Sequence, residues 1–491
     1  ISSPVAIAPQ VLVVDAFGNP KSGLSVTFAP AVGSGSVTGG TTTTNTSGLA
    51  TVGSWTLGAA AGANSLTATA TGSGISGNPA TFTATGTAGG AASVIANSVT
   101  TQSATVGTAV AAPPSVIVRD AASNPVAGAT VTFAITIGTA GSLVGPTQTT
   151  DGAGVATVTS WTLDTTARAN NTVTATVSGS GITGNPVTFT ATGTAGTAAK
   201  LTVNRQPSAT PQSGVIFPTT PRIQVADQYN NAVATTPGVV ITASVLTGPG
   251  GTPVLTPLTA TTSSAGLATF TNFTLSGLIG SYTFQFDATA AGLGTVSSAA
   301  VTLTPGLATA LTITTQPPAS SASGAVLTPS STVQLVDGAG NAVSQASVAI
   351  TAAIASGPGG SSLTGTTVVT TGATGLATFS NLILNGASGS YTLSFTGTAQ
   401  PAVSSSTIVL GAGGATKLAI TTQPSSSVTS GAVFPQQPVI QLQDASSNPV
   451  NQAGVQVNVS LASGSGTLGG TTTAVTNGSG QASFTNLQIT G

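Results

Sequence analysis

Val13-Val14-Asp15-Ala16-Phe17-Gly18-Asn19-Pro20 ends a short apolar run with an Asp, three loop-forming residues and an Asn. The same pattern returns four more times, and its acidic positions are Asp15, Asp120, Asp227, Asp337 and Asp444. Successive members lie 105, 107, 110 and 107 residues apart. This period is longer than that of solenoid repeats, which usually have about 20–50 residues, and it is the size of an independent β-sandwich domain. The pattern therefore predicts a tandem array of five domains.

The composition favours an all-β fold. Only 3% of the 491 residues are charged, against about 25% in typical globular proteins. The chain is rich in Thr and Val, which favour strands, and it contains no Glu, no Met and few Lys, which favour helices. In the first repeat Leu24–Phe28 alternates apolar and polar residues, as a half-buried strand does. We therefore expect strands throughout, with the polar surface supplied by Thr, Ser, Asn and the backbone.

The repeated residues resemble a known family. Asp15–Pro20 followed by 26–28 (Val-Thr-Phe) and 46–52 resembles the bacterial immunoglobulin-like domains of the invasin and intimin type, and Asp120–Gly128 with 131–133 matches that pattern more closely. The resemblance covers all five repeats. It implies immunoglobulin-like β-sandwiches that form the stalks of bacterial surface adhesins or other extracellular fibres.

The period and the resemblance together predict five immunoglobulin-like domains in an elongated rod. Short uncharged linkers separate them, such as Gly89-Gly90-Ala91. By alignment of the repeats, the first domain lacks its first strand and the fifth lacks its last strands. The expected domains are residues 1–90, 91–199, 200–309, 310–416 and 417–491.

The chain lacks the residues that several classes of function require. The chain has no Cys and no His, so it offers no disulfide, thiol or imidazole. Its net charge of -1 provides no basic surface for nucleic acid, and no apolar run approaches the roughly 20 residues of a membrane span. Without a nucleophile and base, or paired carboxylates, catalysis has no candidate residues. We expect no enzyme activity, no cofactor, no nucleic-acid partner and no membrane insertion in this segment.

The repeated Asp and Asn admit two interpretations. Asp15, Asp120, Asp227, Asp337 and Asp444 are weak candidates for a metal site, because calcium binds oxygen ligands. Calcium takes about six to eight such ligands, however, and usually several carboxylates, whereas each repeat offers one Asp in this pattern. The alternative is a turn in which the Asp and Asn side chains cap local backbone groups. The sequence favours the turn.

Two other recurring features are predicted to be structural. Trp55 and Trp161 could stack on sugars, but the equivalent positions in later repeats are Phe273, Leu382 and Leu487, so a core role is favoured. Glycines also recur before a core strand, and we interpret them as hairpin glycines rather than phosphate-binding loops. They are Gly48, Gly154, Gly266, Gly375 and Gly480.

The leading hypothesis for function is structural. It is a repeat region of an extracellular bacterial fibre or stalk at the cell surface. Because neutral surfaces associate without desolvating ions, and low net charge favours association, we expect the chain to form a homopolymer through head-to-tail or lateral contacts, which would assemble into a filament. The alternative hypothesis is an adhesin array that binds a carbohydrate or host receptor, with a glycan or host surface as the partner.

Overall fold

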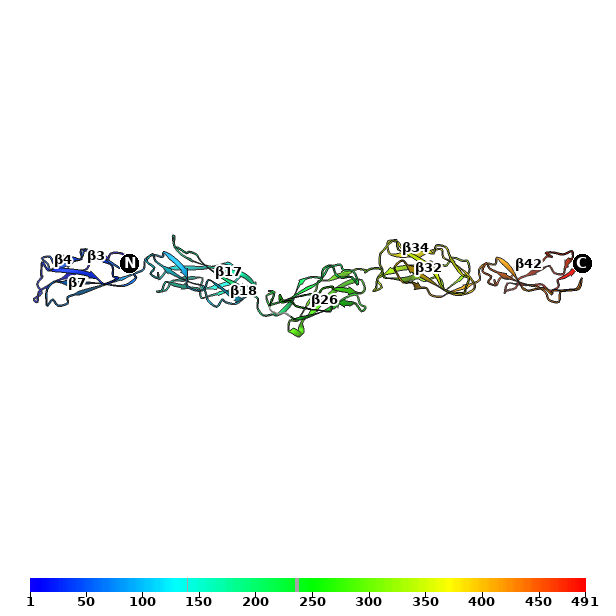
Figure 1. Cartoon of the computed structure of the whole chain (residues 1–491), viewed down its shortest axis with the longest axis horizontal. Coiled ribbons are helices and arrows are strands. Elements are labelled where there is room, and N and C mark those ends of the chain that lie inside the picture. The colour runs from blue at the N-terminus through cyan, green and yellow to red at the C-terminus, as the bar shows by residue number, and fades with distance from the viewer. Residues whose placement is uncertain (139, 235–237) are drawn as a thin grey trace. The chain divides into compact units, whose positions relative to one another are not determined.

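The computed structural model describes residues 1–138, 140–234 and 238–491. Within them the chain consists of strands, turns and one short 3-10 helix, η1 (Thr289–Ala291), which confirms the all-β prediction (Figure 1). No described helix has the length and apolar character needed to cross a membrane. Contacts divide the chain into two compact units. One comprises residues 1–202, 225–237 and 264–266, and the other comprises 203–224, 238–263 and 267–491.

The first repeat forms a four-stranded sheet, in the order β4-β2-β7-β8, and two strand pairs, β1-β5 and β3-β6. Trp55 and Phe28 are buried in the core of this repeat beside Val26 and Leu66. The strands are β1 (Gln10–Leu12), β2 (Ser25–Pro30), β3 (Ser36–Thr38), β4 (Thr41–Thr43), β5 (Leu49–Thr51), β6 (Ser54–Thr56), β7 (Gly62–Ala70) and β8 (Ala80–Gly86).

The second repeat builds a larger sandwich. A five-stranded sheet, in the order β10-β18-β17-β12-β14, lies with the three-stranded sheet β15-β11-β9 and the pair β13-β16. Side chains of both larger sheets, such as Val118 and Val173, share one buried core. The strands are β9 (Ser93–Ala96), β10 (Thr101–Thr105), β11 (Ser115–Arg119), β12 (Thr130–Ile137), β13 (Ser142–Val144), β14 (Thr147–Thr149), β15 (Val155–Thr157), β16 (Ser160–Thr162), β17 (Arg168–Val177) and β18 (Val187–Thr194).

The third repeat carries the largest aromatic core. Phe273 contacts Phe217, Phe284 and Phe270 edge-on, with ring centroids 5.2, 5.1 and 5.9 Å apart. Its sheets are β19-β20-β24, β23-β21-β26-β27 with β28 on β26, and β22-β25. The strands are β19 (Lys200–Arg205), β20 (Arg222–Ala226), β21 (Val240–Thr247), β22 (Val254–Thr256), β23 (Thr259–Thr261), β24 (Leu267–Thr269), β25 (Thr274–Ser276), β26 (Gly280–Asp287), β27 (Thr295–Ser297) and β28 (Val301–Leu303).

The fourth repeat has the same design as the second. Its sheets are β29-β31-β35, β30-β39-β37-β32-β34 with β38 on β37, and β33-β36. Leu335 of one sheet and Leu393 of the other lie in one buried core. The strands are β29 (Ala310–Thr315), β30 (Ser320–Ala322), β31 (Ser331–Val336), β32 (Ala349–Ser356), β33 (Ser362–Thr364), β34 (Val368–Thr370), β35 (Leu376–Phe379), β36 (Ile383–Asn385), β37 (Gly389–Gly397), β38 (Val403–Ser404) and β39 (Ile408–Gly411).

The fifth repeat forms three small sheets, β40-β41-β45, β42-β44 and β43-β46, around Phe484 and Leu487. Every described sheet of the chain draws its strands from a single repeat. The strands are β40 (Lys417–Thr422), β41 (Val439–Gln443), β42 (Gln456–Asn458), β43 (Thr467–Gly469), β44 (Thr473–Val475), β45 (Gln481–Ser483) and β46 (Gln488–Thr490).

Candidate functional site

The repeated Asp and Asn form a tight turn whose geometry is clearest in the fourth repeat. The N–H of Asp337 donates to the carbonyl oxygen of Asn341 at 2.9 Å. The Oδ1 atom of Asp337 accepts the backbone N–H groups of Ala339 and Asn341, both at 2.9 Å. Such side-chain capping of local donors is the behaviour that favours Asp in turns. The predicted turn is therefore present.

The second carboxylate oxygen connects the turn to the linker that precedes the repeat. Oδ2 of Asp337 accepts the N–H of Gly306 and the Nδ2 group of Asn341, both at 2.9 Å. Each glycine involved lies 31 residues before its Asp. The other three such contacts join Gly89 to Asp120, Gly196 to Asp227 and Gly413 to Asp444, at 2.9, 2.9 and 2.7 Å.

The Asn side chain binds the preceding repeat. Nδ2 of Asn341 donates to the carbonyl oxygen of Gly277 at 2.9 Å, and its Oδ1 accepts the N–H of Ile279 at 2.9 Å. The two bonds pair the planar amide with the backbone of one loop. Asn124 binds Ala59 and Ala61 in this way, Asn231 binds Thr165 and Ala167, and Asn448 binds Gly386 and Ser388.

We call each Asp and Asn with these contacts a junction pair, and the loop that the Asn binds a receiving loop. The junction pairs are Asp120/Asn124, Asp227/Asn231, Asp337/Asn341 and Asp444/Asn448. Both partners of every junction contact lie inside one of the two compact units. The receiving loops connect β6 to β7, β16 to β17, β25 to β26 and β36 to β37.

A buried apolar residue anchors each receiving loop. The carbonyl oxygen that binds the Asn lies four residues after Trp55, Trp161, Phe273 or Leu382, all of which are at most 1% exposed. The core interpretation of Trp55 and Trp161 is therefore confirmed. The indole N–H of Trp55 also donates to the carbonyl oxygen of Ser34 at 2.8 Å.

Polar side chains then hold the receiving loops in three different ways. In the first repeat, Oδ1 of Asn64 accepts the N–H of Gly58 at 3.0 Å. In the third and fourth repeats, the buried hydroxyls of Tyr282 and Tyr391 donate to the carbonyl oxygens of Leu278 and Ala387, both at 2.7 Å. Burial raises the pKa of Tyr282, so its hydroxyl stays protonated as a donor. Each carbonyl bound by a tyrosine lies between the two backbone groups that bind the Asn.

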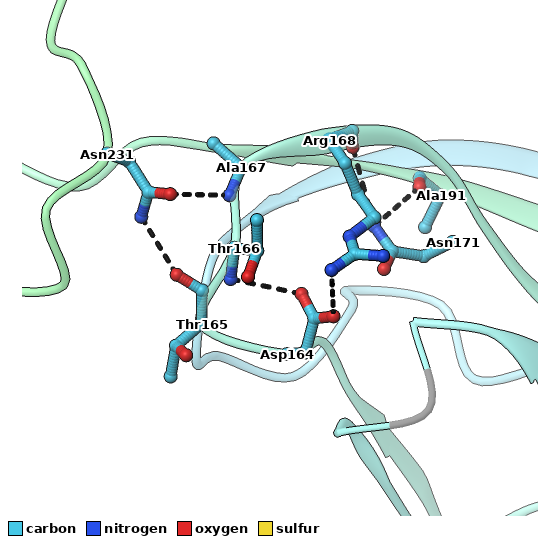
Figure 2. A network of polar contacts seen from close by, with 8 residues as sticks. All are labelled: Asp164, Thr165, Thr166, Ala167, Arg168, Asn171, Ala191 and Asn231. Carbon is cyan, nitrogen blue, oxygen red and sulfur yellow. Dashed lines mark hydrogen bonds and ion pairs between the residues drawn. The ribbon is translucent and has the colours of Figure 1, made fainter.

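The second repeat uses an ion pair for the same purpose. Oδ1 of Asp164 accepts the N–H of Thr166 at 3.1 Å, and Oδ2 lies 3.0 Å from Nη2 of Arg168. Figure 2 shows these contacts beside the amide of Asn231, which binds the same loop. Asp164 lies in a loop, yet its side chain is buried. Its carboxylate can be buried because both oxygens are paired.

At two of the four junctions, the residue two positions after the junction Asp makes a further contact. Ser446 lies with its hydroxyl 3.1 Å from that of Ser323 in the preceding repeat. Tyr229 takes the equivalent place in the third repeat, where its ring lies against Gly107. A methyl group on Gly107 would approach the Tyr229 hydroxyl to 3.0 Å. The junctions therefore share one hydrogen-bonding plan and differ in the side chains around it.

The hydrogen bonds keep the junction carboxylates ionised. Burial pushes the pKa of Asp120 upward, but donation from Gly89, Asn124 and Ala122 outweighs it, so the pKa lies below its ordinary value. The same balance lowers the pKa of Asp227, Asp337 and Asp444. At neutral pH each junction thus contains a buried, ionised carboxylate that is stabilised by hydrogen-bond donors. Charge-assisted hydrogen bonds of this kind are among the stronger ones in proteins.

The first repeat has the turn, but no bond from it to another repeat is seen in the described part of the chain. Oδ1 of Asp15 accepts the N–H groups of Phe17 and Asn19, both at 2.9 Å, and Oδ2 accepts Nδ2 of Asn19 at 3.3 Å. The backbone bond from Asn19 is the main cause that lowers the pKa of Asp15. The turn therefore forms from local sequence, independently of a receiving loop.

The geometry at the five candidate metal ligands is that of hydrogen-bond acceptors. Both oxygens of Asp15, Asp120, Asp227, Asp337 and Asp444 accept N–H groups. Each repeat supplies one of these carboxylates, and the described residues contain no group of three or more Asp, Glu, His or Cys suited to a metal ion. The arrangement acts as a connection between segments of backbone.

The sequence predicted the turn and missed its partner. The Asn binds backbone atoms 60 to 66 residues earlier, and backbone groups have no signature in the sequence. One signal was available, because a Gly stands 31 residues before each of the four junction Asp residues. The recurring glycines lie in tight turns before a core strand, but the hairpin prediction is wrong, because each turn connects strands of two different sheets. Gly375 shows why glycine is needed there. It has a φ of +77°, and a Cβ there would lie 1.9 Å from the carbonyl oxygen of Val343.

No family model and no curated protein matches the chain. Solved structures that resemble it include the Escherichia coli adhesin FdeC, which is 20% identical over 66% of this chain and 99% of that one, with a TM-score of 0.32. Invasin, a bacterial integrin-binding protein, is 17% identical over 86% and 78%, with a TM-score of 0.31. The D0–D1 domains of intimin are 16% identical over 42% and 97%, with a TM-score of 0.16.

Invasin and intimin are also the two proteins whose domains the repeated residues resemble. All three likenesses lie below 25% identity and below a TM-score of 0.5.

Proposed function

We propose that this chain is the structural repeat region of a bacterial extracellular fibre or stalk at the cell surface, and that it has no catalytic role. The observation that supports this most strongly is the junction pair. Four times the same two residues bind the linker and the preceding repeat with the same bonds. The most regular polar feature of the chain is therefore the connection between its repeats.

The proposal includes five immunoglobulin-like domains, at residues 1–90, 91–199, 200–309, 310–416 and 417–491, that together form an elongated rod. It is supported by the confinement of each described sheet to one repeat. Each junction adds several hydrogen bonds, which contribute about 0.5–1.5 kcal/mol apiece when neutral and about 1.5–3 kcal/mol when charged. Bonds of this strength restrict bending at a short linker.

Small-angle X-ray scattering on the whole chain tests the rod. We expect a maximum dimension close to the summed lengths of five sandwiches, and a shortened, broader distance distribution when all four junction Asn residues are replaced by Ala. A compact particle in the unaltered chain would rule out the stalk. Identical scattering from the two chains would show that the junction pairs do not set the shape.

Self-association into a filament is the second part of the proposal. With 15 charged side chains among 491 residues and a net charge of -1, like chains repel each other weakly. Sedimentation of the chain over a wide concentration range should show association through head-to-tail or lateral contacts. A monomer at every concentration would remove the filament and leave the stalk. Saturable binding to a glycan array or a host receptor would instead support the adhesin alternative.

A further inference from the structure

Two repeats contain a parallel ladder between an early edge strand and the last strand. In the second repeat β10 pairs with β18 from Thr101↔Thr190 to Thr105↔Thr194. Two more backbone bonds continue the ladder at its ends, from Thr190 N–H to Thr100 at 2.8 Å and from Val106 N–H to Thr194 at 2.9 Å. In the fourth repeat β30 pairs with β39 over Ser320–Ala322. The other strand pairs with a register in these repeats are antiparallel.

The position of this ladder in the chain decides how it responds to tension. The chain enters a repeat before the early strand and leaves it after the last strand. Because the two strands are parallel, a pull on both ends of the chain drags them past each other along their length. All hydrogen bonds of the ladder then resist together, whereas strands that are pulled apart from one end lose their bonds one at a time. This geometry places the ladder in the path of an end-to-end load.

The third repeat has the weakest version of this ladder. Its equivalent strands meet in a single parallel bridge, Gln212↔Thr304. Thr302 N–H donates to Ala209 at 2.7 Å, Thr304 N–H to Pro211 at 2.9 Å and Ser213 N–H to Thr304 at 2.9 Å. In a parallel ladder the two strands donate N–H groups in turn. The bond missing from this series would be donated by the N–H of residue 211, and proline has none. Ser321 occupies the equivalent place in the fourth repeat, within a continuous register.

Core packing alone would predict a different order of stability among the repeats. The third repeat has the richest aromatic core, with five phenylalanines in edge-on or tilted contact. Aromatic pairs add about 0.5–1.5 kcal/mol each beyond the area they bury. We therefore expect the third repeat to be the weakest of the three under tension, but not the least stable to heat. The two properties separate because forced unfolding depends on the bonds in the load path, through the unfolding rate.

We propose that the parallel ladder is the load-bearing element of the second, third and fourth repeats, and that Pro211 makes the third repeat open before the second and fourth under tension. The inference rests on the proposed stalk function for its biological meaning. Among these three repeats, the third then lengthens first and protects the second and the fourth.

The test is single-molecule stretching of the whole chain by its two ends. We expect Pro211→Ser to slow forced opening of the third repeat about fivefold, which corresponds to one hydrogen bond of about 1 kcal/mol. The reciprocal change, Ser321→Pro, should speed opening of the fourth repeat by a similar factor. Unchanged rates in both variants would overturn the proposal and leave the stalk function intact, because scattering decides the latter independently.

A second pulling direction separates load bearing from general weakening. The chain has no cysteine, so handles can be attached to Gly359→Cys and Thr374→Cys, which leaves β30 and β39 outside the load path. Gly359 has open space around its Cα, so the change is tolerated there. The effect of Ser321→Pro should disappear in this direction. If it persists with equal size, Ser321→Pro acts by destabilising the repeat and the ladder is not load bearing.

Discussion

Asn448 donates from Nδ2 to the carbonyl oxygen of Gly386 at 2.9 Å, although the two residues are 62 positions apart and lie in different repeats. The carboxylate of Asp444 accepts a second bond from the same Nδ2, also at 2.9 Å, which fixes the orientation of the amide. One side chain thus connects the turn of one repeat to a loop of the repeat before it. The chain repeats this relationship at three other junctions.

Removal of one junction amide should expose the loop that it binds. Asn341→Ala eliminates the acceptor for the Ile279 N–H and the donor to Gly277. We expect hydrogen exchange at Ile279 to accelerate at least tenfold, with little change in exchange of the β26 and β32 cores. Asn19→Ala is the matched control, because the bond of the Asn19 side chain is to Asp15 in its own turn. Equal protection of Ile279 in Asn341→Ala would contradict the junction.

Acid should weaken the junctions. Hydrogen bonds hold the pKa of Asp444 below its ordinary value despite burial, so the folded state binds this proton less well than the unfolded chain does. The stabilisation is therefore complete above the unfolded pKa of about 3.9, and it is lost as the pH falls through the lower, folded pKa. The amide NMR signal of Gly413, which donates to Asp444 at 2.7 Å, reports this titration.

The Gly413 signal should titrate with a midpoint below about 3.9, and Asp444→Asn should make it independent of pH in this range. A midpoint above that value would mean that burial, rather than hydrogen bonding, dominates at this carboxylate.

Two glycines of the fourth repeat allow the cost of backbone strain to be measured apart from the cost of steric crowding. Gly340 and Gly375 have φ values of +85° and +77°, but an added Cβ at Gly340 meets nothing within 4 Å, whereas at Gly375 it lies 1.9 Å from the Val343 carbonyl oxygen. Gly340→Ala should cost about 1–2 kcal/mol from the left-handed conformation alone. Gly375→Ala adds about 1–3 kcal/mol of overpacking. Equal unfolding free energies by denaturant titration would refute this assignment.

The tyrosines that hold the receiving loops should act on the junction more than on the fold. Tyr391→Phe keeps the buried ring and removes the hydroxyl bonds to Ala387 and Ser361. We expect a loss of about 1–3 kcal/mol, since buried polar groups are left unpaired. Faster hydrogen exchange at Ser388, the residue bound by Asn448, is the specific sign. Slower or unchanged exchange there, with the same loss of stability, would restrict Tyr391 to a core role.

The sequence was sufficient for the parts of the fold that depend on local chemistry. Alternation and β-forming residues predicted strands, and Asp337 with Asn341 predicted a turn, because side-chain capping acts over four residues. The partner of Asn341 could not be predicted in this way. It is a pair of backbone groups in another repeat, and any residue except proline supplies the same N–H and C=O.

The proposed effect of Pro211 on the ladder shows a similar limit. A proline is visible in the sequence, but its effect depends on the strand that it faces. The register Gln212↔Thr304 is needed to show that the missing N–H falls inside a ladder. Asp164 illustrates the same point, since its burial follows from the ion pair with Arg168 and the local bond to Thr166.

Distance measurement between two spin labels across one junction tests the central claim most directly. The exposed residues Thr259 and Thr370 can be changed to cysteine and labelled in a chain that has no other cysteine. We predict one narrow distance distribution in the otherwise unaltered chain and a clearly broader one after Asn341→Ala. A distribution of the same width in both chains would show that the junction pair does not join the repeats.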